Sequence, residues 1–156
     1  MRALIAVALI SLASQPAPQT LEVVASLSGY NLLSPTERCC GFEYSVLANR
    51  VTSLRVTSGP AASDRQVRGS LPAERLAAVA QVLERQDFFG LPSSVGASPV
   101  DGDLRVIRAR LAQGRWHEVR IGEAAFGDAP TQVERRAVAC WRAIRALVEI
   151  SGANVQ

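Results

Sequence analysis

The chain has 156 residues, a formal net charge of +3 and 48% hydrophobic residues, a length that suits a single domain. All of its basic residues are arginines, and they alternate with acidic and apolar residues along the chain. Nucleic-acid binders usually carry a concentrated basic stripe, so nucleic acid is not an expected partner.

The first 13 residues have the pattern of an export signal. Arg2 gives the positive start, residues 3–12 are uncharged and mostly apolar, and small residues precede an expected cleavage after Ala13. The apolar run is shorter than the roughly 20 residues that a membrane-spanning helix needs. A buried first strand or helix is the alternative. We expect a secreted or periplasmic protein with no membrane span after the signal is removed.

The first half of the mature chain shows strand-type alternation after a Pro-rich, flexible leader at 14–20. Strands are predicted at 21–28, 42–48 and 51–57, with a loop at 29–41. A helix is expected from about Pro72, ending where Gly90 and Pro92 stop it, and a loop follows at 92–102.

A hairpin is predicted from strands 104–112 and 116–121. A three-residue loop, 113–115, would keep the apolar residues on one face and place Arg108 opposite Arg120. In the same register Arg110 faces Glu118, Leu111 faces His117, Ala109 faces Val119 and Ile107 faces Ile121. The adjacent apolar residues Val106 and Ile107 suggest a bulge in the first strand.

A last helix is expected at about 130–150, before a loose tail at 151–156. We therefore predict a single α+β domain at 21–150. Its architecture would be an antiparallel sheet of four or five strands with two helices packed on one face.

The segment Cys39-Cys40-Gly41-Phe42-Glu43-Tyr44 resembles a group of small secreted bacterial domains of unknown function. In that group a Cys-x-Gly segment leads into a Tyr-containing strand. A helix ending in Asp-Phe-Phe-x-Leu follows, here Asp87 to Leu91, and then an Asp-led hairpin and a final helix. This chain lacks the second Cys and the Pro that the group places before its Tyr. The resemblance implies export and fold, and no chemistry.

Three cysteines in an exported chain suggest one disulfide. Cys140 lies on the apolar stripe of the last helix, and Cys40 has the strand parity of Phe42, so a Cys40–Cys140 bridge is favoured. The resemblance to the secreted domains favours Cys39 as the partner instead, and a Cys39–Cys40 bridge is a further alternative.

The sequence gives little support to an enzyme, a metal site or a cofactor. His117 is the only histidine, and the spacing of Cys39, Cys40 and His117 matches no zinc motif. Asp101-Gly102-Asp103 lacks the rest of a calcium loop and is better explained by turn chemistry. No catalytic or cofactor motif is present, so none is predicted.

The remaining candidate site is an outward face formed by Arg108, Trp116 and Arg120. An exposed tryptophan beside arginines is typical of a binding hot spot. The leading hypothesis is an exported, non-enzymatic binding or accessory domain that contacts a protein or an anionic envelope component. The alternatives are a small hydrolase or thiol enzyme using His117 with Cys39 or a nearby acid, and a purely structural envelope protein. The oligomeric state is not predicted.

Overall fold

The computed structural model describes residues 20–31, 34–58, 65–97, 102–112 and 114–150. The predicted signal at 1–13 and the tail at 151–156 lie outside the described residues, as does all of the leader except Thr20. In chain order the elements are β1 (Leu21–Asn31), β2 (Ser34–Val46), β3 (Val51–Ser58), β4 (Arg65–Ser70), α1 (Ala73–Arg85), η1 (Phe88–Gly90), β5 (Ser94–Val95), β6 (Leu104–Leu111), β7 (His117–Ile121), η2 (Glu123–Phe126) and α2 (Gln132–Ile150).

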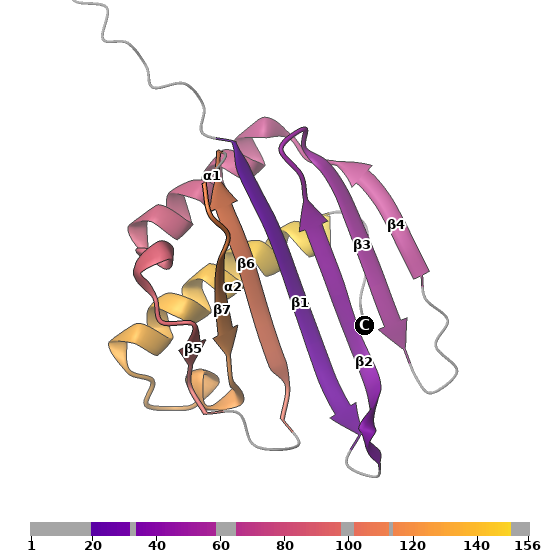
Figure 1. Cartoon of the computed structure of the whole chain (residues 1–156), viewed down its shortest axis with the longest axis vertical. Helices are drawn as coiled ribbons and strands as arrows, with labels where there is room; N and C mark the ends of the chain where they lie inside the picture. The colour runs from indigo at the N-terminus through magenta and orange to yellow at the C-terminus, as the bar shows by residue number, and fades with distance from the viewer. Residues whose placement is uncertain (1–19, 32–33, 59–64, 98–101, 113, 151–156) are drawn as a thin grey trace, which may run out of the picture.

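The fold is α+β, with a seven-stranded sheet in the order β4-β3-β2-β1-β6-β7-β5. Figure 1 shows both long helices, α1 and α2, on the same side of this sheet. The opposite side, which faces the viewer in Figure 1, carries none of the helices in the described part of the chain and is called the open face below. None of the helices in the described part of the chain is long and apolar enough to cross a membrane.

The expected four or five strands were too few. The loop predicted at 29–41 is instead the end of β1 and the first half of β2, which form one long hairpin. The strand β4 pairs with β3, although its sequence RQVRGS has one large apolar residue, Val67, and so gives no alternation signal. The two-residue β5 pairs parallel to β7, so the sheet is not purely antiparallel.

The core lies between the sheet and the helices and is formed by alternate residues of the strands. Tyr44, Leu54, Ile107 and Val119 are all at most 1% exposed. Phe42 stacks on Trp141 of α2, with ring centroids 5.9 Å apart. Helix and sheet are therefore joined by apolar packing, the dominant favourable term in folding.

The register of the β6–β7 hairpin differs by two residues from the prediction. His117 lies opposite Ala109, and Glu118 lies opposite Arg108. The chain turns directly after β6, because Ala112 has a left-handed φ of 51° and the Gly114 N–H donates to the Leu111 carbonyl at 2.9 Å. A shift of two residues leaves every side chain on its predicted face, since strand side chains alternate.

The bulge expected at Val106 and Ile107 is also absent, because consecutive residues of β6 pair with consecutive residues of β7 and β1 there. Val106 lies on the open face. Arg105, two residues before Ile107, points to the inward side of the sheet, and its guanidinium lies over the Phe126 ring at 4.2 Å. The face of that ring lets an arginine occupy an inward strand position.

The start of α2 is fixed by a capping box. The Glu134 N–H donates to Thr131 Oγ1 at 3.2 Å, and the Thr131 N–H donates to Glu134 Oε2 at 2.6 Å. These contacts lower the pKa of the Glu134 carboxyl, the backbone hydrogen bond from Thr131 being the largest cause. They therefore identify Thr131 as the residue that caps α2.

Candidate binding surface

The strand registers arrange the open face into rows of side chains that run across the sheet. Arg108 lies beside Val24 of β1 on one side and beside Glu118 of β7 on the other. In the next row Arg120 lies beside Val106 of β6. The predicted site residues Arg108 and Arg120 are therefore on the same face, in neighbouring rows.

Arg108 and Arg120 do not face one another, as the predicted hairpin register required. Both are instead paired with Glu118, at 3.6 Å from Arg108 Nε to Oε2 and 2.9 Å from Arg120 Nε to Oε1. The two arginine side chains are 49% and 62% exposed. Exposed pairs of this kind contribute little stability, so the arginines can exchange partners at small cost.

Trp116 directly precedes β7 and is 39% exposed. The guanidinium carbons of Arg108 and Arg110 lie 5.5 and 4.9 Å from its ring centroid. Cation–π contacts at exposed sites are each worth about 0.5–1 kcal/mol, which restricts the ring without burying it. The structure thus brings Arg108 and Trp116 into contact and adds Arg110, which the predicted site did not include.

The row that contains Trp116 continues across the sheet through Arg110, Glu22, Leu47 and Val51. Arg110 pairs with Glu22, Glu22 precedes the paired residues Val23 and Val46, and the Leu47 N–H donates to the Val51 carbonyl. We call these five residues the Trp116 row. One end of the row is Trp116, the other is formed by Leu47 and Val51, which are 49% and 39% exposed, and an ion pair lies between the two ends.

The central carboxylate of the row is the most enclosed group on the open face. The Glu22 side chain is 11% exposed and binds the Arg110 guanidinium through Nε. It also accepts a hydrogen bond from the Ala48 N–H at 3.2 Å. The hydrogen bond from Arg110 is the largest cause of a lowered pKa at Glu22, and the bond from Ala48 adds to it against an opposing effect of burial.

Leu47 and Val51 were not identified from the sequence as surface residues of interest. Leu47 follows the buried Val46 by one position, so strict alternation already places it on the open face. What the sequence could not give was the sheet order, which sets this end of β2 beside β1 and β6 and so beside Trp116.

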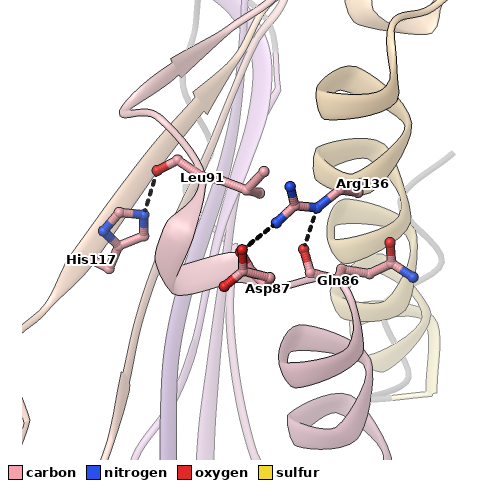
Figure 2. Close-up of polar contacts among 5 residues, drawn as sticks. All are labelled: Gln86, Asp87, Leu91, His117 and Arg136. Atoms are coloured by element: carbon pink, nitrogen blue, oxygen red, sulfur yellow. Dashed lines mark hydrogen bonds and ion pairs between the residues drawn. The ribbon is translucent and has the colours of Figure 1, made fainter.

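His117, which the hydrolase alternative would use, makes packing and hydrogen-bond contacts within the fold. Its Nε2 lies 3.0 Å from the Leu91 carbonyl oxygen, as Figure 2 shows, and a carbonyl can only accept, so Nε2 carries the proton. Its ring is perpendicular to that of Phe88, with centroids 5.3 Å apart. Among the described residues, no acid or thiol contacts it.

Figure 2 also shows how the end of α1 is tied to α2 near this histidine. Arg136 donates from Nε to the Gln86 carbonyl at 2.7 Å and from Nη2 to the Asp87 carboxylate at 2.7 Å. A third bond runs from Nη2 to the Asp87 carbonyl at 3.0 Å. The bond to the Gln86 carbonyl satisfies an acceptor that the end of α1 would otherwise leave without a partner.

Cys140 is fully buried and carries a free thiol. Burial raises its pKa to about 12, so the reactive thiolate is scarce at neutral pH. The side chains of Cys39 and Cys40 lie outside the described residues, so their part in a disulfide stays a prediction.

Within the described ranges, no group of three His, Cys, Asp or Glu residues is arranged to hold a metal ion. Asp103, part of the calcium-like segment, instead pairs with Arg105 at 3.4 Å. Asp101 lies outside the described residues.

No model of a protein family matches the chain, and no curated protein matches it significantly. The resemblance to small secreted bacterial domains therefore stays a prediction.

Proposed function

We propose that the chain is an exported, non-enzymatic binding domain whose open face holds an acidic protein partner. The observation that carries the proposal is the Trp116 row, in which an exposed tryptophan in contact with two arginines shares one edge of an uncovered face with exposed Leu47 and Val51. Tryptophan and arginine are the residues most enriched in binding hot spots.

The charge of the open face supports an acidic partner. On its described strands arginines outnumber acidic residues: Arg55, Arg68, Arg108, Arg110 and Arg120 stand against Glu22, Glu43 and Glu118. Complementary charge speeds encounter and selects the partner, while the apolar ends of the row supply buried area. A carboxylate of the partner can replace Glu118 on Arg120 because that pair is largely exposed.

The surroundings of His117 give no support to the hydrolase alternative, since the ring packs against Phe88 and Phe89 and its Nε2 is bound to the Leu91 carbonyl. A general acid or base must lie within hydrogen-bond reach of the proton that it transfers, and Nε2 is already engaged by a backbone carbonyl. The proposal therefore rests on binding.

The test is quantitative capture of exported proteins by the wild-type chain and by variants Trp116→Ala and Arg120→Gln. Arg75→Gln, on the exposed side of α1, is the matched control because it removes an arginine without touching the open face. We expect at least one acidic protein to be bound about tenfold or more weakly by both face variants and normally by the control, and titration with that purified protein should repeat the pattern.

A ligand bound equally by the wild type and both face variants would contradict the proposal. If the face variants lose binding to anionic lipid vesicles or polysaccharide, and no protein partner is found, the open face would be assigned to an envelope component. Absence of any ligand would favour the purely structural alternative.

A further inference from the structure

A hollow of about 340 Å³ lies between η2 and the first half of α2, away from the open face. It belongs to the helical layer, which Figure 1 shows behind the sheet. Its walls come from the end of η2, the segment that follows it and one side of α2. The lining residues are Ala125, Phe126, Gly127, Pro130, Arg135, Val138, Ala139 and Arg142.

The hollow has an apolar base and a cationic rim. Ala125 and Val138 are 1% and 6% exposed, whereas Arg135 and Arg142 are exposed. On α2 the lining residues are spaced i, i+3, i+4 and i+7, which puts both arginines on the same side of the helix as the apolar residues between them. No acidic residue lines the hollow.

The walls are held by contacts that do not need a ligand. The Phe126 ring packs against the Arg105 guanidinium at 4.2 Å, and Arg135 donates from Nη1 to the Pro130 carbonyl at 2.6 Å. Arg142 makes no ion pair or hydrogen bond with the described part of the chain. Arg135 is therefore held against the backbone of Pro130, whereas Arg142 is exposed at the rim, where no acidic residue lines the hollow.

We infer that this hollow is a binding site for a small organic anion with an apolar body. The volume lies at the small end of ligand sites, which are typically about 300–1,000 Å³ and mostly apolar with a few polar groups. The apolar body lies on Phe126, Val138 and Ala139, and the anionic group accepts charge-assisted hydrogen bonds from Arg142. This site does not depend on the proposed protein-binding role of the open face.

The test uses two fluorescent probes of similar shape. The anionic probe is 8-anilinonaphthalene-1-sulfonate, and the neutral probe is N-phenyl-1-naphthylamine, which lacks the sulfonate. We expect the anionic probe to bind saturably with one-to-one stoichiometry and at least about tenfold more tightly than the neutral one. Arg142→Gln should remove most of that difference, while Ala139→Phe should fill the hollow and abolish binding of both probes.

Arg75→Gln is the control, because it removes an arginine from the exposed side of α1 and should leave both affinities unchanged. Near-ultraviolet circular dichroism of each variant excludes probe binding to a loosely packed state. If Ala139→Phe fails to fold, the surface double variant Arg135→Gln/Arg142→Gln is used instead, and it should remove the preference for the anionic probe while the neutral probe still binds. Equal affinity for the two probes, or an anionic affinity unchanged by Arg142→Gln, would overturn the inference.

Discussion

The carboxylate of Glu22 in β1 binds the guanidinium of Arg110 in β6 on the open face of the sheet, opposite to α1 and α2. Although this face is open, the Glu22 side chain is only 11% exposed, because Arg110 and the backbone of Ala48 enclose it. A carboxylate enclosed in this way is stabilised as the anion and depends on its donors.

Replacing Arg110 by Ala should therefore destabilise the fold by about 1–3 kcal/mol, because Glu22 would keep only the Ala48 N–H as a partner. The free energy of unfolding from urea titration measures the effect. Glu118→Gln, which disturbs only exposed pairs, is the control and should change stability by less than about 0.5 kcal/mol. A smaller effect for Arg110→Ala than for the control would show that the Glu22 pair is not a structural contact.

The same pair predicts a pH dependence. The folded-state pKa of Glu22 is lowered from the ordinary value of 4.5, chiefly by the Arg110 hydrogen bond. The unfolded chain then binds more protons, so the stabilisation is present above about pH 4.5 and is lost as pH falls through the folded pKa. Urea midpoints of the wild type and Glu22→Gln should converge on acidification. A constant difference between pH 6 and pH 3 would contradict the lowered pKa.

The sequence predicted the faces of the strands better than their number or pairing. Alternation placed Ile107, Ala109, Val119 and Ile121 together on one face, and all four are buried. It could not detect β4, whose residues are mostly polar, or the two-residue β5. Alternation in the sequence reports which side chains of a strand are buried. A short or polar edge strand gives no such pattern, because it forms by pairing with a strand that is distant in the chain.

For the candidate site, too, the sequence predicted the face of the side chains correctly and their cross-strand partners incorrectly. Trp116 was correctly expected to be outward, because a two-residue register shift preserves the face. The partners of the two predicted arginines were wrong, since Glu118 lies opposite Arg108. The contribution of Leu47 depends on the sheet order, which brings β2 and β6 to either side of β1.

Substitution of the two tryptophans should reduce stability by very different amounts. Trp141 is 6% exposed and stacks on Phe42, so Trp141→Ala should cost about 3–5 kcal/mol of stability. Trp116 is 39% exposed, and Trp116→Ala should cost less than about 1 kcal/mol. Denaturant titration checks both values. Acrylamide should quench the fluorescence of a Trp141→Phe variant more strongly than that of Trp116→Phe, and the reverse order would mean that Trp116 is covered.

Arg136 should be more sensitive to substitution than Arg142 on the same helix. Its three hydrogen bonds to Gln86 and Asp87 join the end of α1 to α2, and Arg136→Ala removes the donor to the Gln86 carbonyl, the Asp87 carbonyl and the Asp87 carboxylate. We expect a loss of about 1–3 kcal/mol and faster amide hydrogen exchange in the last turn of α1. Arg142→Ala on the same helix is the control, and an equal loss there would indicate a general effect of helix charge.

Cys140 provides a test of the predicted disulfide. In the folded protein its thiol should resist alkylation at pH 8, because burial raises its pKa to about 12 and blocks access. After denaturation without reductant, the free thiol of the structure predicts that Cys140 becomes alkylated, whereas a Cys40–Cys140 or Cys39–Cys140 bridge predicts that it does not. Peptide mass mapping distinguishes these outcomes. Protection that persists after denaturation would restore the disulfide prediction, and rapid labelling of the folded chain would contradict the burial of this helix face.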